Sequence, residues 1–374
     1  MRRQIENHLA EVRQKRGLSA AQLAKAAGVT RQTIYAMEAG TYIPNTAVAL
    51  KLARTLDAAV EDLFALAPDE AAEAAFDEAQ AQLLPGSEVP DPGQPVQLCR
   101  VDQRLIACPP AAAPWYFPAA DGVVSAARAR AGKIDVRVLP EAEEGRRLLV
   151  AGCDPGMSVL ARHALRNGVE LVLAHRNSSE SLKLLKEGCV HVAGTHLRDE
   201  LSGESNIPAI GRIFSKGQVA VISFAIWEEG IVTQRGNPQA IRGVEDLARG
   251  GVSIVNREPG AGSRLLLDSH LKRLGLSAHD IRGYDCVAYG HLPAAAQVQA
   301  GHASACIATR AAARAFGLGF IPLATERYDL AVRRRHLELP AMQTLFDTLA
   351  RSTFRRELEF LGGYDTRPAG ERLL

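Results

Sequence analysis

The sequence predicts a multidomain protein, in which an all-α N-terminal domain precedes an α/β domain of two lobes. Two observations favour this fold class. In the first 66 residues, apolar positions recur at helical spacing and glycines separate the segments. From residue 146 onward, short apolar strands alternate with helical segments, which indicates parallel pairing. The length of 374 residues is enough for two or three domains.

Residues 18–40 predict two short helices joined by a tight turn. Ser19 is a good N-cap, and Gln22 completes a capping box with it. Gly28 follows, where the end of a helix favours a residue that tolerates positive φ, and Thr30 can cap the second helix. The outward face of that helix begins with Arg and Gln, which can pair with base edges in DNA. A helical hairpin with a solvated face is the alternative.

The flanking segments extend this pattern. Ile5, Leu9 and Val12 mark a helix before the pair, whereas Val48 and Leu52 mark one after it. With the motif RGLSxxQLAxxAGVTRQTIxxMExG, residues 5–64 resemble the DNA-binding domain of the lambda-repressor class, the XRE family.

The resemblance implies that the chain binds a double-stranded DNA operator as a homodimer. The side chains expected to contact DNA are Thr30, Arg31, Gln32, Thr33, Tyr35, Ala36 and Arg16. Ala20 stands where the family often has a Gln that contacts the DNA backbone. A phosphate contact is therefore expected to be missing.

Composition excludes several classes of protein. The net charge of +2 says little about partners, but the N-terminus lacks the apolar stretch of a secretory signal. The longest apolar run, 219–226, is too short to span a bilayer. The six cysteines show no C-x-x-C spacing. We therefore expect a cytoplasmic protein with reduced thiols and no membrane association.

Four segments are expected. Residues 1–66 form the helix-turn-helix domain, 67–95 a partly helical linker, 96–145 a short β-containing connection, and 146–374 the two-lobed domain. The linker is expected to hold one helix, at 69–84, which could also pack against its twin in a dimer. The connection is expected to contain a hairpin, 96–101 with 104–107, and an aromatic cluster at 115–117 that plugs the space between domains.

The C-terminal segment predicts two α/β lobes with a hinge, and a single doubly wound sheet is the alternative. The first lobe has strands at 148–153, 169–175 and 189–197, with helices at 155–167 and 178–187. The second has strands at 219–227, 252–255, 285–288 and 304–307, with helices at 264–274 and 293–300.

Polar residues gather where these strands end and helices begin. Gly260, Gly262 and Ser263 precede a helix, whose N-terminus favours an anion, although a plain capped turn is equally compatible. Ligands of open α/β sheets bind at the carboxyl ends of strands. The candidate ligand-binding residues are Asp154, Ser158, Asn177, Ser178, Ser179, Thr195, His196, Gly262, Ser263, Arg264 and His291.

A second resemblance covers residues 148–370. The segments AGCDPGMSVLARHA, RNSSESLKLLKEGCVHVAGTHL and VNREPGAGSRLLLD, among others, resemble the periplasmic-binding-protein-like (type II) domain of cytoplasmic regulators and molybdenum-cofactor enzymes. This resemblance implies an oxyanion, molybdate or tungstate foremost, held between the lobes by hydroxyls and backbone N–H groups. At 301–306 the chain lacks an Asp that the family tends to have, so the ligand contacts of the second lobe are expected to differ.

Other functions are less well supported. Cys189, His191 and His196 could bind zinc, but no fourth ligand is evident, so we predict neither a metal site nor a cofactor. No catalytic motif stands out, so a non-enzymatic regulator that binds DNA and senses a small anion is expected. The alternatives are the same architecture sensing an organic acid or another metabolite, and a molybdenum-pathway enzyme or cofactor-handling protein with an interaction-only helix-turn-helix.

Overall fold

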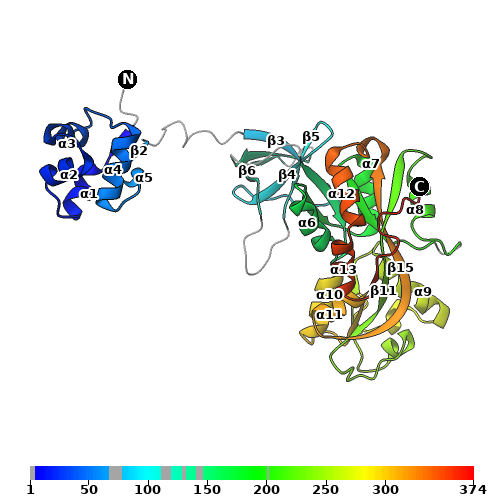
Figure 1. Cartoon of the computed structure of the whole chain (residues 1–374). Helices are drawn as coiled ribbons and strands as arrows, with labels where there is room; N and C mark the ends of the chain where they lie inside the picture. The colour runs from blue at the N-terminus through cyan, green and yellow to red at the C-terminus, as the bar shows by residue number, and fades with distance from the viewer. Residues whose placement is uncertain (1–4, 67–77, 111–118, 129–131, 140–145, 200–201) are drawn as a thin grey trace. The chain divides into compact units, whose positions relative to one another are not determined.

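The computed structural model describes residues 5–66, 78–110, 119–128, 132–139, 146–199 and 202–374. They belong to two compact units, Met1–Phe76 and Asp77–Leu374 (Figure 1). The predicted aromatic cluster at 115–117 lies outside the described residues. Within the described part of the chain, no helix has the length and apolar character needed to cross a membrane.

The N-terminal unit is a bundle of short helices around one apolar core. The helices are α1 Leu9–Lys15, α2 Ala20–Ala27, α3 Arg31–Glu38, α4 Thr46–Leu56 and α5 Val60–Leu63. Leu23, Ile34, Met37 and Leu52 are fully buried between them. The expectation of helices in this region is therefore confirmed.

Local sequence signals account for the α2–α3 turn. The backbone N–H of Gln22 donates to Ser19 Oγ at 3.2 Å, and the N–H of Ser19 donates to Gln22 Oε1 at 2.8 Å, which is the predicted capping box. Gly28 ends α2 with φ 74°. Thr30 caps α3 by accepting from the N–H of Thr33 at 3.1 Å. Both predicted caps are confirmed.

The first segment differs from the prediction, because Ile5 belongs to a strand and α1 begins only at Leu9. β1 (Ile5–Asn7) pairs antiparallel with β2 (Phe64–Leu66) at the other end of the unit. Asn7 Oδ1 then accepts from the N–H of Leu9 at 2.9 Å. The backbone pairing thus delays the start of the helix.

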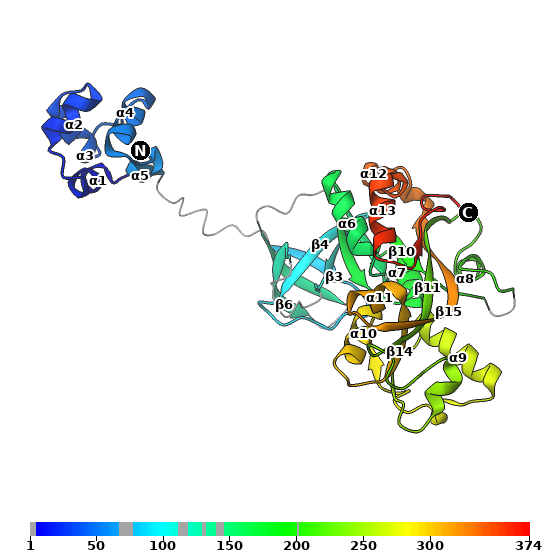
Figure 2. The same ribbon diagram turned by 60° about the horizontal axis from the view of Figure 1, so that its bottom comes forward.

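The second unit opens with a closed barrel of five strands (Figure 2). They are β3 Glu78–Leu83, β4 Pro95–Val101, β5 Arg104–Cys108, β6 Gly122–Arg128 and β7 Lys133–Val138. The predicted hairpin is confirmed as β4 and β5. The helix predicted at 69–84 is wrong where the chain is described: β3 is a strand, because it pairs antiparallel with β7. This tertiary pairing overrides the helix propensity of an Ala-rich segment.

The rest of the second unit is built on a mixed sheet of nine strands. Its order is β13-β12-β14-β11-β15-β10-β8-β9, with β16 (Tyr364–Asp365) beside β11. The other strands are β8 Arg147–Gly152, β9 Glu170–His175, β10 Val192–Thr195, β11 Val219–Thr233, β12 Ile254–Arg257, β13 Val287–Ala288, β14 Ala305–Thr309 and β15 Gly319–Arg333. Pairing among β8, β9 and β10, and of β12 with β13 and β14, is parallel, as predicted.

Helices cover both faces of this sheet. They are α6 Met157–Arg166, α7 Ser178–Glu187, α8 Ile207–Ile213, α9 Gly262–Leu274, α10 His291–Gln299, α11 Arg310–Ala315, α12 Pro340–Ala350 and α13 Ser352–Phe360, with short 3-10 turns at Val244–Ala248, Ala278–Asp280 and Arg334–His336.

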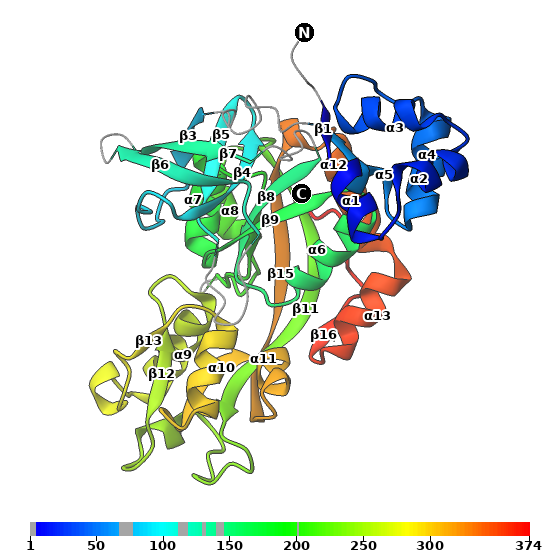
Figure 3. The same ribbon diagram turned by 90° about the vertical axis from the view of Figure 1, so that its left-hand side faces the viewer.

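Two long strands divide the sheet into two lobes (Figure 3). β11 and β15 pair antiparallel over 15 residues each; one end of the pair meets β10 and the other meets β14. We call β8–β10 with α6–α8, α12 and α13 lobe 1, and β12–β14 with α9–α11 lobe 2. Each lobe has its own buried clusters, so the expected two lobes are present on one continuous sheet.

Candidate functional site

The outward face of α3 carries the residues predicted to contact DNA. Thr30, Arg31, Gln32 and Tyr35 are exposed, while Thr33 and Ala36 are half-buried. Arg31 Nη2 donates to the Tyr35 hydroxyl at 2.9 Å, and its guanidinium lies over the Tyr35 ring. This intrahelical contact orders two of the predicted side chains, while Gln32 stays free to approach a base edge.

A salt bridge fixes α3 against α1. Arg13 Nε lies 2.5 Å from Glu38 Oε1, and Arg13 Nη2 lies 3.1 Å from Glu38 Oε2. This hydrogen bonding raises the pKa of Arg13. Arg16 remains exposed and donates to the carbonyl of Asp57 at 2.7 Å. Ala20 is buried in the helical core, so its side chain offers no DNA contact.

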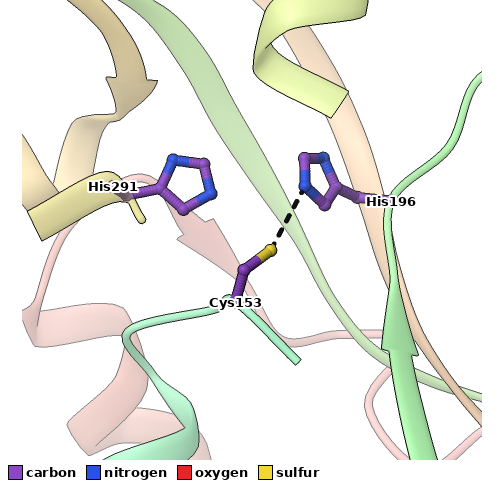
Figure 4. Close-up of side chains that lie close together, drawn as sticks. All are labelled: Cys153, His196 and His291. Carbon is purple, nitrogen blue, oxygen red and sulfur yellow. Dashed lines mark hydrogen bonds between the residues drawn. The ribbon is translucent and has the colours of Figure 1, made fainter. Parts of the chain in front are cut away.

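In the second unit, three side chains from separate strand ends meet where the lobes touch. Cys153 follows β8, His196 follows β10, and His291 begins α10. They point toward one another, and Cys153 Sγ lies 3.5 Å from His196 Nε2 (Figure 4). One ligand atom from each lies within 4.8 Å of those of the other two. All three side chains are buried, and we call them the Cys153 cluster.

Two buried carboxyl groups border this cluster. Glu326 Oε2 lies 2.9 Å from His196 Nδ1, and Glu229 lies 3.8 Å from Nδ1 of both His196 and His291. Burial, together with the neighbouring Glu326, raises the pKa of Glu229 to about 8. Burial also raises the pKa of Glu326. For His196, burial opposes protonation, but Cys153 and Glu229 outweigh it and raise the pKa.

His291 differs from His196 in having no hydrogen-bond partner among the described residues, although both its ring nitrogens are buried. Burial and the nearby guanidinium of Arg257 hold the pKa of His291 well below its usual value, so the ring is neutral. Arg257 itself is buried and pairs with Glu258 at 2.9 Å, and its Nη1 makes no hydrogen bond to a described residue. The ring of His291 and Nη1 of Arg257 are therefore both available to contact a ligand.

The predicted hydroxyl groups make hydrogen bonds within the protein. The Ser158 hydroxyl is exposed and donates to the carbonyl of Pro155, and Thr195 donates to Asn206 Oδ1 at 3.3 Å. Ser178 Oγ accepts from the N–H of His196 at 3.1 Å. Ser263 donates to Glu229 Oε1 inside the protein.

The remaining predicted residues fall into two groups. Asp154, whose pKa burial raises to about 7, accepts from the Tyr364 hydroxyl at 2.7 Å. Arg264 lies over the Tyr284 ring and donates to the carbonyl of Arg257. Among the described residues, neither side chain makes a hydrogen bond to Cys153, His196 or His291.

By contrast, Asn177, Ser179 and Gly262 lie where the lobes meet. Asn177 Nδ2 donates to the carbonyl of Pro259 at 3.3 Å, and Ser179 donates to that of Gly260 at 3.4 Å. A Cβ on Gly262 would lie 2.4 Å from His196 Cε1. The two lobes are therefore in close contact around the cluster.

Sequence reasoning did not single out Cys153, Glu229, Arg257 or Glu326. One signal was available, because Glu229 and Glu326 interrupt largely apolar strands, and such charges in a core have a specific partner or function. The zinc set considered from the sequence is separated in the structure: His191 accepts from the N–H of Leu149 and packs against His336, away from His196.

Chemically, the cluster can do two things. A thiol, an imidazole and a carboxyl in line are the arrangement of an activated nucleophile. A thiolate with two neutral imidazoles is also a ligand set for a soft or borderline metal ion.

Comparison with known proteins identifies both parts of the chain. Residues 160–350 match the family described as PBP superfamily domain, and residues 9–63 match a helix-turn-helix family. The uncharacterized protein YvgK of Bacillus subtilis (strain 168) is 33% identical over 248 residues, which cover 65% of this chain and 80% of that protein.

The chain belongs to the PBP superfamily. This PBP superfamily protein also carries an N-terminal helix-turn-helix, which is 39% identical over 66 residues to an uncharacterized HTH-type transcriptional regulator of Archaeoglobus fulgidus; the match covers 18% of this chain and 94% of that protein. Among solved structures, the periplasmic molybdate-binding protein of Azotobacter vinelandii is similar, with a TM-score of 0.45 and 16% identity over 58% of this chain and 98% of that chain.

Proposed function

We propose that this PBP superfamily protein is a DNA-binding transcription regulator whose activity depends on a small ligand held between its two lobes. The observation that carries the proposal is the pairing of a helix-turn-helix, whose α3 face is open to solvent, with a domain whose lobes meet at buried, partly unpaired polar groups. No catalytic role is part of the proposal.

A ligand that contacts both lobes favours their closed arrangement over an open one, because only the closed arrangement provides all its contacts. Hinge closure of this kind is a common way to change the geometry of an attached element. In a homodimer, it would alter how two copies of α3 are presented to an operator.

For the ligand, molybdate or tungstate is the first candidate. The buried Arg257, with Nη1 unpaired among the described residues, and the N-terminus of α9 both favour an anion. The carboxyl groups of Glu229 and Glu326 disfavour one when they are ionised. An organic acid remains the alternative anion. The buried histidines and Cys153 favour a second candidate, a metal ion, for which the specific argument follows below.

The test combines DNA binding with thermal stability. An operator selected from random duplexes is titrated with the full chain in the absence of additive and with molybdate, tungstate, sulfate or phosphate. An oxyanion ligand at about 100 times its Kd should stabilise the fold by roughly 2.7 kcal/mol and change the apparent Kd for the operator. The regulator proposal fails if no duplex is preferred over random DNA. The oxyanion candidate alone fails if the operator binds but no anion alters stability or affinity.

A further inference from the structure

We propose that Cys153, His196 and His291 form a binding site for one soft or borderline transition-metal ion, Zn²⁺ or Cu⁺, which links the two lobes. The inference rests on the proposed function and names the chemical class of the ligand that the interlobe site takes. It develops the second of the two candidate ligands named above, a metal ion.

The first argument is the geometry of the donor atoms. Ligands placed about 2.0–2.3 Å from a tetrahedral ion lie roughly 3.5 Å apart. Cys153 Sγ and His196 Nε2 are already 3.5 Å apart. The ligand atoms of all three residues lie within 4.8 Å of one another, so a shift of about 1 Å in His291 completes the set.

The second argument is independent and concerns His291. Both its ring nitrogens are buried without a hydrogen-bond partner among the described residues, which is unfavourable for such a polar group. An ion between His291, His196 and Cys153 would provide the missing partner.

The carboxyl groups around the cluster suit the same role. Glu326 Oε2 lies 2.9 Å from His196 Nδ1, and Nε2 of the same ring faces Cys153. Metal-bound histidines commonly have such a carboxylate partner, which fixes the tautomer and the ring orientation. Glu229, which accepts from Ser263, places a second carboxyl group 3.8 Å from Nδ1 of both histidines.

The donor types select the class of ion. Thiolate and imidazole prefer Zn²⁺ and Cu⁺, whereas Mg²⁺ and Ca²⁺ prefer oxygen ligands. If Cys153 and His196 instead acted as a nucleophile and its base, the unpaired His291 and the nearby Glu229 would have no role. Such a role would also require a substrate to reach a buried thiol. The metal site therefore accounts for more of the observed groups.

The three metal ligands come from both lobes, so metal binding would affect how the lobes are arranged. Cys153 and His196 belong to lobe 1, whereas His291 begins α10 of lobe 2 (Figure 4). An ion bound by all three would hold the lobes together, adding to the contacts of Asn177 and Ser179 with the 259–260 turn. Metal binding would thus set the closed arrangement on which the proposed regulation depends.

The test uses the full chain, stripped of metal with a chelator and kept reduced. Competition titrations measure binding of Zn²⁺ and Cu⁺, with Mg²⁺, Ca²⁺ and molybdate as comparison ligands, and Co²⁺ serves as a spectroscopic probe of thiolate ligation. We expect one Zn²⁺ or Cu⁺ per chain and a thiolate-to-cobalt charge-transfer band. Cys153→Ser should abolish that band, and His291→Gln should weaken binding by more than about tenfold.

Matched controls come from exposed residues of lobe 2. Cys286→Ser and His302→Gln remove the same chemical groups at residues outside the cluster and should leave affinity unchanged. Circular dichroism checks that each variant folds, and His291→Gln still decides the question if Cys153→Ser does not.

Each outcome has one meaning. Absence of stoichiometric binding, or equal affinity in the wild-type protein and in both cluster variants, overturns the metal site. Alkylation of Cys153 by a small electrophile at the same rate with and without Zn²⁺ also contradicts it. If the metal binds but operator affinity does not change, the metal site exists but has no part in regulation. If no metal binds but an oxyanion changes operator affinity, the metal site is refuted and the regulator proposal stands.

Discussion

Nδ1 of His196 lies 2.9 Å from a carboxylate oxygen of Glu326, and Nε2 of the same ring faces the thiol of Cys153. The contact joins β15, which crosses between the lobes, to the loop after β10. His196 thus has a fixed ring orientation before any ligand arrives.

This relationship predicts a graded loss of metal affinity. Glu326→Ala removes the acceptor and should weaken Zn²⁺ binding by about 10–100-fold, as for other partners of metal-bound histidines. Glu326→Gln keeps an acceptor oxygen but removes the ionisable carboxyl, so Zn²⁺ affinity should fall by less than in Glu326→Ala. Chelator competition at one pH measures both. Identical affinities for wild type, Gln and Ala would show that Glu326 does not position His196.

A substitution at Gly262 tests whether the two lobes are in contact. In Gly262→Ala the new methyl carbon would lie 2.4 Å from His196 Cε1, so overpacking should destabilise the second unit by about 1–3 kcal/mol. Gly211→Ala is the control: it lies within α8 with no heavy atom within 4 Å of its Cβ position, and helix propensity should make it neutral or slightly stabilising. Denaturant unfolding measures both, and equal effects would count against lobe contact in solution.

The Arg13–Glu38 pair should stabilise the N-terminal unit. The two side chains are only 12% and 11% exposed, so Glu38→Ala leaves a poorly solvated guanidinium and should cost about 1–3 kcal/mol. A double-mutant cycle with Arg13→Ala isolates the coupling. Glu11→Gln, which breaks the exposed pair with Lys15, should have no measurable effect. A coupling of zero would mean that α1 and α3 are held by apolar packing alone.

Gln32 is the best test of base reading. Gln32→Ala should reduce discrimination between operator and random DNA by about 1–3 kcal/mol per base pair read. Arg16→Ala should instead weaken binding to every sequence and flatten the salt dependence, as a phosphate contact does. Gel-shift titrations at several salt concentrations distinguish the two. An equal loss on both DNAs for Gln32→Ala would remove Gln32 from the base-reading set.

The buried His191 should make the free energy of unfolding depend on pH. Burial, followed by the neighbouring His336, lowers the pKa of His191 from 6.5 to about 4 in the folded protein. Between pH 4 and 6.5 the unfolded chain therefore binds a proton that the folded chain does not, and stability falls as the pH falls through this window.

His191→Asn should flatten this part of the stability curve, because an Asn side-chain oxygen can accept from the N–H of Leu149 without titrating. Urea unfolding at half-unit pH steps measures the slope. An unchanged slope would assign the acid sensitivity to other groups.

The sequence by itself determined the elements that depend on near neighbours. The capping box of Ser19 and Gln22, the positive φ at Gly28 and the cap at Thr30 act over three or four residues, so they can be recognised without tertiary structure. The alternation of strands and helices likewise identified β8 to β10 and their parallel pairing, since the connecting helices require it.

Tertiary structure alone decided the rest. β3 is a strand because its backbone pairs with β7, some fifty residues later, although its own residues favour a helix. The Cys153 cluster collects three side chains from three strand or helix ends, and Glu229 and Glu326 come to it from β11 and β15. Because these contacts depend on how distant segments meet, no periodicity or local spacing in the sequence specifies them.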